Sequence, residues 1–355
     1  MLAVLIVFVI VGVIYSFRFE KKEESVLVGG VFIGECTDSG WNESHYDGIL
    51  SACEDLDCRF SIRERVPEEE AALRKAVRGL CKEGCSAVFL TSYGYGLYAD
   101  RIAEDFPGVA FYSVSGEGKA DNCMSYLPRM YQARYLSGIV AGATSRTGIL
   151  GVVVSMPLPE TNRLINAYAL GARLANPDAR IILYFTGSWD DQAEEEAAVT
   201  RLVAKGADVI TYHEDKPYAI DAAERSGVYS IGYDGVYKEY SDRFLTAAVF
   251  KWDILYERVL GDFLSGRANF SNSYWLGISD GAVSLYPYSI RVGKRARKLV
   301  EKEKVRIQTW RDVFSGEIYD NTGRLRCGKD ERISDSELFY GMEWYVDGVE
   351  TYAED

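Results

Sequence analysis

Two short groups of residues combine an aromatic or imidazole ring with carboxylates, and such groups could hold a small flat molecule. The first is Trp189-Asp190 and the second is His213-Glu214-Asp215. An indole can stack on a planar ring, while a carboxylate accepts hydrogen bonds from the edge of that ring. Trp41, far earlier in the chain, supplies a second indole. These residue types indicate binding of a ligand rather than a chemical reaction.

Other chemistries find little support. Only two His residues are present, which argues against a multi-histidine metal centre, and the seven Cys lack the spacing of a four-ligand zinc site. The glycines at positions 29, 30 and 34 do not form the G-x-G-x-x-G pattern of a dinucleotide site. We find no paired nucleophile and base. The sequence therefore predicts no catalytic residue, no metal and no cofactor.

The stretch 147–215 must position the second indole. Apolar runs at 149–154, 181–186 and 208–212 alternate with helical patterns at 161–174 and 191–205. This alternation predicts βαβ units whose strands are buried on both faces. Ligands of open α/β sheets bind at the carboxyl ends of the strands, and Trp189 and Asp215 each follow such an end. We therefore expect them at one rim.

The first part of the chain repeats this arrangement. Apolar runs at 25–33, 60–66, 87–92 and 109–114 predict further strands, and a helix is expected to open at Pro67. The acidic residues 68–70 would complement the dipole of that helix, so we assign them no role in a site. Trp41 and Asn42 follow the first strand, and Tyr93 follows the third. Asp234 follows a later strand at 228–231.

Each candidate also has a purely structural interpretation. Trp41 could cover a core, and Trp189 could pack under its own helix. Asp215 could be an exposed turn acid or a helix N-cap, and Asn42 is equally suited to an N-cap. His213 fits best as a structural histidine beside the site.

Composition and charge limit the number of domains and the classes of partner. The 355 residues suffice for two domains, and 26% charged with 48% hydrophobic residues is an ordinary globular balance. A formal charge of −13 argues against nucleic acid as a partner. Residues 2–17 are almost entirely apolar and are followed by basic residues, which predicts a membrane anchor or signal segment and an extracytoplasmic protein.

Most of the chain past this segment resembles the basic membrane protein family, the BMP or PnrA-like group of type I periplasmic solute-binding proteins. The resemblance rests on the order of its pieces over some three hundred residues. These pieces are Thr37-Asp-Ser-Gly-Trp-Asn42, Leu90-Thr-Ser-Tyr-Gly94, Tyr131-Gln-Ala-Arg-Tyr-Leu-Ser-Gly138, Ile165-Asn-Ala-Tyr-Ala-Leu-Gly-Ala-Arg173, Gly187-Ser-Trp-Asp190, Gly206-Ala-Asp-Val-Ile-Thr-Tyr-His213 and Met342-Glu-Trp-Tyr-Val-Asp-Gly348.

This resemblance implies a purine base or nucleoside held between two lobes and delivered to the permease subunits of an ABC transporter. It implies that Trp41 and Trp189 stack on the base and that Asp215 meets its edge, with Asn42, Tyr93 and Asp234 as further ligand-binding residues. Trp at both walls is closest to the purine-base, or adenine-binding, branch. Nucleoside-binding members carry an Asp after the fourth strand, where Ser115 stands here.

The resemblance also implies a type I periplasmic-binding-protein fold, with two Rossmann-like lobes and a hinge. We expect residues 1–24 as the anchor, 25–146 with about 247–280 as the first lobe, 147–246 with about 281–318 as the second lobe and 319–355 as an extension. A membrane-tethered sensor with the same fold is the alternative to a transport receptor. An enzyme acting on nucleosides is a third possibility.

Overall fold

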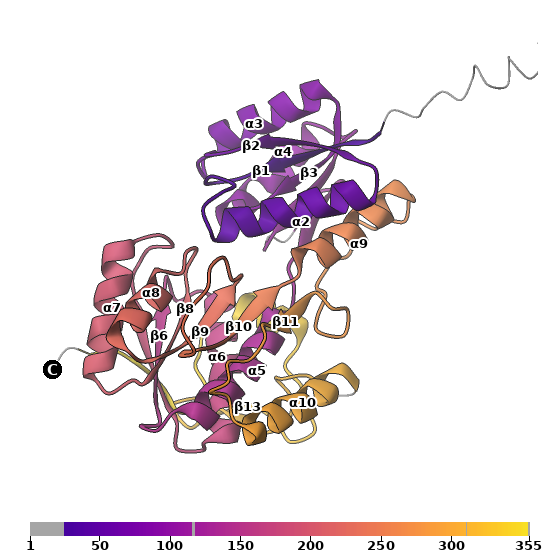
Figure 1. Ribbon diagram of the computed structural model, residues 1–355. Helices are drawn as coiled ribbons and strands as arrows, with labels where there is room; N and C mark the ends of the chain where they lie inside the picture. The colour runs from indigo at the N-terminus through magenta and orange to yellow at the C-terminus, as the bar shows by residue number, and fades with distance from the viewer. Residues whose placement is uncertain (1–24, 116–117, 310, 354–355) are drawn as a thin grey trace, which may run out of the picture.

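The computed structural model describes residues 25–115, 118–309 and 311–353, which form two α/β lobes (Figure 1). The predicted apolar anchor at 1–24 lies outside the described residues. Within those residues no helix is both long enough and apolar enough to cross a bilayer. The prediction of two lobes, each built on a parallel sheet, is confirmed.

The first lobe holds a five-stranded parallel sheet in the order β2-β1-β3-β4-β5. Helix α2 packs against β1, β2 and α9, while α3 packs against β1, β2 and β3. The bounds are β1 Leu27–Val31, α2 Trp41–Asp55, β2 Arg59–Arg63, α3 Glu70–Glu83, β3 Cys85–Leu90, η1 Tyr93–Leu97, α4 Ala99–Glu104, β4 Ala110–Val114, β5 Cys123–Tyr126 and α9 Trp252–Leu264.

The second lobe holds seven strands in the order β11-β10-β9-β8-β6-β7-β14, of which only β11 runs antiparallel to its neighbour. The bounds are α5 Met130–Thr144, β6 Ile149–Val154, α6 Pro159–Ala175, β7 Arg180–Phe185, α7 Gln192–Ala204, β8 Val209–His213, α8 Tyr218–Ser226, β9 Tyr229–Asp234, β10 Phe244–Phe250, β11 Val283–Leu285 and α10 Lys294–Thr309. The tail adds β12 Ile318–Tyr319, β13 Leu325–Cys327, η2 Glu337–Gly341 and β14 Val349–Thr351, which pairs with β7.

Local sequence explains these elements. Strand β6 is buried along nearly its whole length, as its continuous apolar run requires for a central parallel strand. Helix α3 buries Leu73, Ala76, Val77 and Leu80, the i, i+3, i+4, i+7 stripe of a one-sided helix. Small residues let α5 approach α6 closely, because a Cβ on Gly138 would lie 2.1 Å from a backbone oxygen of α6.

The chain crosses between the lobes three times: after β5, after β10 and near residues 274–278. The first and third crossings run side by side, since the Leu127 amide donates to the Tyr274 carbonyl at 2.9 Å and the Arg129 amide donates to the Leu276 carbonyl at 2.7 Å. Figure 1 shows α9 returning to lie beside α2 in the first lobe.

Two placements differ from the sequence-based expectation. Helix α5 was expected in the first lobe, but it packs against α6, β10 and α10 of the second. Strand β10 was also expected largely with the first lobe, but it pairs with β9. Helix α3 begins at Glu70 rather than at Pro67, which leaves Glu68 outside the helix.

Candidate functional site

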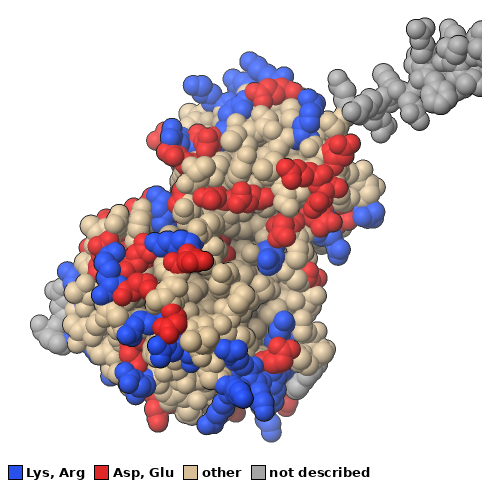
Figure 2. All heavy atoms as spheres, in the orientation of Figure 1, with Lys and Arg blue, Asp and Glu red and all other residues tan. Residues whose placement is uncertain are grey.

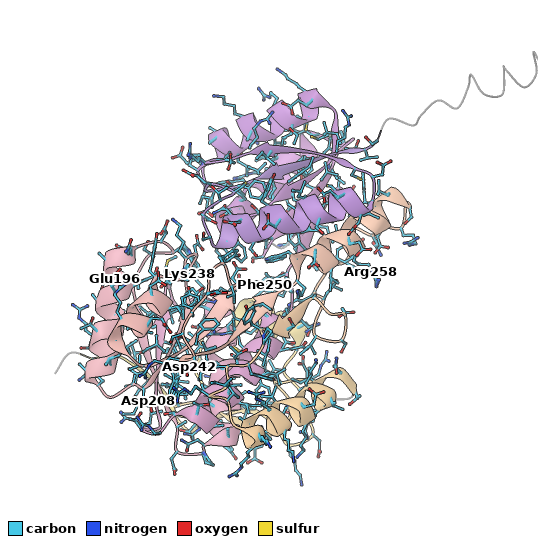
Figure 3. All side chains as sticks on the ribbon, in the orientation of Figure 1. Glu196, Asp208, Lys238, Asp242, Phe250 and Arg258 are labelled. Carbon is cyan, nitrogen blue, oxygen red and sulfur yellow. The ribbon has the colours of Figure 1, made fainter. Side chains whose placement is uncertain are left out.

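A cleft lies between the two lobes, at the carboxyl ends of their central strands. An outer cavity of about 810 Å³ has walls from both lobes, including Asp38 and Asn42 from the first and Tyr218 and Lys238 from the second. Figure 3 labels Lys238 on the second lobe, below the end of α2. Figure 2 shows acidic side chains concentrated on the part of the first lobe nearest the second lobe.

An inner chamber of about 90 Å³ adjoins this cleft. The two cavities share Ile33, Trp189 and Asp215, so the chamber continues inward from the cleft. The full lining of the chamber is Ile33, Trp41, Glu68, Ser92, Tyr93, Ser115, Glu160, Trp189, His213, Glu214, Asp215 and Tyr233. Four of the six sequence-predicted residues, Trp41, Tyr93, Trp189 and Asp215, therefore meet there.

The first lobe holds Trp41 at the start of α2 in a fixed orientation. Its indole Nε1 donates a hydrogen bond to the Thr91 carbonyl at 2.7 Å. Its ring also meets Trp252 and Phe250 edge-on, with ring centroids 5.7 Å and 6.1 Å apart. Figure 3 labels Phe250 at the junction of the lobes. The aromatic cluster thus positions one indole at the chamber wall.

The second lobe supplies Trp189 from the turn after β7. The ring is half-buried and lies edge-on to His213, with centroids 5.8 Å apart and an interplanar angle of 61°. Its carbonyl accepts a hydrogen bond of 2.9 Å from the Asp215 amide. The turn after β7 and the turn after β8 are thereby joined, so that Trp189 and Asp215 lie at one rim.

The lobes touch directly beside the chamber. The Trp41 amide donates to the Asp215 carbonyl at 3.1 Å, and the Ser44 hydroxyl donates to Asp234 Oδ1 at 2.9 Å. A Cβ on Gly40 would lie 2.0 Å from the Asp215 carbonyl oxygen, which only glycine permits. The structure is therefore a closed form in which the backbones of the two lobes meet.

Carboxyl groups from both lobes crowd this junction. Burial raises the pKa of Asp215 to about 8, and the nearby carboxylates of Asp38, Asp190 and Asp234 add to the rise, while Lys216 opposes it. Burial likewise raises the pKa of Asp234 to about 6, although hydrogen bonds from its neighbours act to lower that pKa. Closing the lobes thus favours the protonated form of these groups.

The two remaining predicted residues lie outside the chamber. Asn42 is buried in the first turn of α2, where its side chain accepts from the Gly34 amide and donates to Asp38 Oδ2 at 2.7 Å. It lines the outer cavity, and the helix N-cap is Gly40 instead. Asp234 lines neither cavity, and its carboxylate joins the lobes through Ser44. Their roles as ligand-binding residues stay predictions.

Several chamber residues were missed from sequence. Glu68 was assigned to helix capping, but its Oε1 accepts from Ser92 Oγ at 2.5 Å and from the Gly94 amide at 2.6 Å. Burial raises the pKa of Glu160, while the charge of Arg163 and a hydrogen bond with Ser115 act to lower that pKa. Ser115 itself adopts a φ of 59°, an uncommon left-handed conformation that often occurs at functional sites. The one available signal for Ser115 was its place directly after β4, whereas Glu160 lies in the first turn of α6, where an acid also complements the helix dipole.

Among the residues that the structure describes, no group of three or more His, Cys, Asp or Glu side chains is arranged to hold a metal ion. The chamber is lined by an indole from each lobe, Trp41 and Trp189, together with hydrogen-bonding side chains.

Comparison with known proteins shows which family the chain matches. The family described as ABC transporter substrate-binding protein PnrA-like matches residues 15–318. A purine-binding protein of Brucella abortus is 32% identical over 332 residues, which cover 92% of this chain and 94% of the relative. A putative ABC transporter glucose-binding protein of Haloferax volcanii is 27% identical over 93% of this chain and 82% of the relative.

Solved structures share the fold. A transcriptional activator of the comK gene from Bacillus halodurans superposes with a TM-score of 0.72 at 24% identity, covering 80% of this chain and 98% of that one. An ABC transporter solute-binding protein from Aeropyrum pernix superposes with a TM-score of 0.70 at 18% identity, covering 80% of this chain and 91% of that one. At these identities the likeness concerns the fold alone, which is that of periplasmic solute-binding proteins.

Proposed function

The chain belongs to the PnrA-like family of ABC transporter substrate-binding proteins, and from that premise we propose that its solute is a purine base. In this proposal Trp41 and Trp189 stack on the two faces of the base as the lobes close. The protein works outside the cytoplasm, held at the membrane by its N-terminal segment, and passes the base to the permease subunits of the transporter.

The single observation that carries the proposal is the placement of two indoles from opposite lobes at one chamber. Indoles offer broad flat faces, which match a planar heterocycle. The purine-binding relative from Brucella abortus, at 32% identity, points the same way. The putative glucose-binding relative is less similar, at 27% identity.

The binding free energy expected from these contacts is in the range that a transport receptor needs. Stacking contributes about 1–3 kcal/mol for each face of a base. A hydrogen bond to an uncharged polar group adds about 0.5–1.5 kcal/mol. Two stacked faces and two such hydrogen bonds sum to roughly 3–9 kcal/mol, a range that includes the ~8 kcal/mol of a micromolar dissociation constant.

Adenine is the base that we propose first. Nucleoside-binding members of the family carry an acid where this chain has Ser115, so a free base fits this chain better than a ribose-bearing ligand. The remaining predicted residues have supporting roles in this proposal: Asp215 at the base edge, Tyr93 at the chamber wall, and Asn42 with Asp234 where the lobes meet.

Calorimetric titration of the soluble part, from about residue 24 onward, tests this function. The panel consists of adenine, guanine, hypoxanthine, adenosine, inosine and glucose. We expect a one-to-one complex of micromolar or tighter affinity with at least one purine base, and weaker binding of the nucleosides. Binding of glucose alone, or of none of the panel at millimolar concentration, would overturn the proposal.

A further inference from the structure

Two side chains of the inner chamber have buried polar atoms with no partner in the protein. Of the described residues that line the chamber, only His213, at Nδ1, and Glu214, at Oε2, have such atoms. The two residues are 3% and 2% exposed. A buried polar atom without a partner costs about 1–3 kcal/mol, and a ligand in the chamber that formed hydrogen bonds with these two atoms would recover that cost.

The surroundings hold both groups in place. Glu214 uses its other oxygen, Oε1, to accept a hydrogen bond of 2.9 Å from Thr186 Oγ1, which fixes the carboxyl plane. The imidazole of His213 packs against Tyr233, with centroids 4.5 Å apart, and stands edge-on to Trp189.

Both groups are uncharged at neutral pH. Burial, reinforced by Arg134 and Arg163, lowers the pKa of His213 well below its ordinary value. Burial, reinforced mainly by Glu195, raises the pKa of Glu214 to about 10. A neutral imidazole has one donor and one acceptor nitrogen, and a protonated carboxyl group has one donor hydroxyl beside an acceptor oxygen.

We propose that His213 and Glu214 form hydrogen bonds with the edge of the ligand, as adjacent neutral donor and acceptor groups, and thereby set the specificity of the site. The complementary ligand is an uncharged heterocycle with a donor next to an acceptor, such as the amidine edge of an aminopurine or the lactam edge of an oxopurine. A purine anion such as urate should bind more weakly, because no Lys or Arg side chain of the described residues lines the chamber. This inference rests on the proposed function and assigns the pair a role beyond that of Asp215.

The test uses shape-conserving variants. Glu214→Leu and His213→Phe remove the polar atoms, while Glu214→Gln keeps a donor beside an acceptor. Ser230→Ala is the matched control, because Ser230 is a fully buried residue of the same lobe with an unpartnered hydroxyl oxygen and does not line the chamber. Calorimetry with adenine, hypoxanthine and urate and the melting temperature of each free protein are measured at pH 7.

We expect Glu214→Leu and His213→Phe each to weaken binding of the preferred base by at least about tenfold. Glu214→Gln should stay within about threefold of the wild type, and Ser230→Ala should be unchanged. The free Glu214→Leu protein should melt at or above the wild-type temperature, since it loses an unsatisfied buried group. A purely structural carboxyl would give the reverse pattern, with a lower melting temperature and unchanged affinity.

Either of two results would overturn the inference. The first is binding by Glu214→Leu and His213→Phe within about twofold of a wild-type protein that does bind purines, which would leave the proposed function standing. The second is tight binding of urate. If the wild type binds no purine at all, the proposed function fails, and the inference fails with it.

Discussion

Trp189 offers the cleanest test of stacking in the chamber. Trp189→Ala removes the indole wall supplied by the second lobe. The ring is half-buried in the turn after β7 and lines both cavities, so its removal should cost the fold little. Trp41 is less suitable, because its indole also donates to the Thr91 carbonyl and packs against Trp252, so truncation there would disturb the first lobe as well.

The size of the effect follows from the lost face. Stacking on one aromatic face contributes about 1–3 kcal/mol, which corresponds to a dissociation constant about 5 to 140 times weaker. Trp189→Phe keeps a smaller flat ring, so it should recover most of the affinity. Isothermal titration calorimetry of the three proteins with adenine gives these constants, and thermal unfolding without ligand shows whether the fold is intact.

One result would refute this reasoning. If Trp189→Ala binds adenine within about twofold of the wild type while its unfolding temperature is unchanged, the indole does not stack on the ligand. Tyr319→Ala provides the matched control, because Tyr319 is an exposed ring of the second lobe that is 45% exposed and hydrogen-bonds Glu317 rather than lining the chamber.

Three further predictions concern pH, closure and packing. Because the pKa values of Asp215 and Glu195 are raised to about 8, the folded closed protein keeps protons that the unfolded chain releases above about pH 4. Its melting temperature should therefore fall as the pH rises from 5.5 to 8.5, and Asp215→Asn should make this fall less steep. A melting temperature that rises over this pH range would contradict the prediction. Gly40→Ala places a Cβ 2.0 Å from the opposing carbonyl oxygen, so calorimetry should show at least about tenfold weaker binding with little change in stability, and wild-type affinity would show that the lobes need not meet there. Gly138→Ala forces α5 away from α6 and should lower the urea-unfolding free energy by roughly 1–3 kcal/mol, an estimate that an unchanged midpoint would disprove.

Local pattern predicted the second lobe well. The run 149–154 coincides with β6, and the expected helix at 161–174 lies within α6. Continuous apolar strands and one-sided helices are local features, so their bounds can be read from the residues. The same reasoning placed Trp189 and Asp215 at strand ends, and the structure brings both to the inner chamber.

Long-range contacts could not be read in this way. Helix α5 packs against α6, but its own residues do not identify that partner, so it was placed in the other lobe with the rest of residues 25–146. Glu68 has the sequence signature of a helix start, and the donors that hold it, Ser92 and the Gly94 amide, lie more than twenty residues away. His213 and Glu214 similarly depend on burial that only the assembled lobes create.

A crystal structure of residues 25–355 grown with adenine tests the stacking of the base between the two indoles most directly. We expect the base to lie between the indole planes of Trp41 and Trp189, with its edge against His213 and Glu214. A base bound with either indole turned away from it, or a chamber that excludes the base while the outer cleft holds a sugar, would contradict the account.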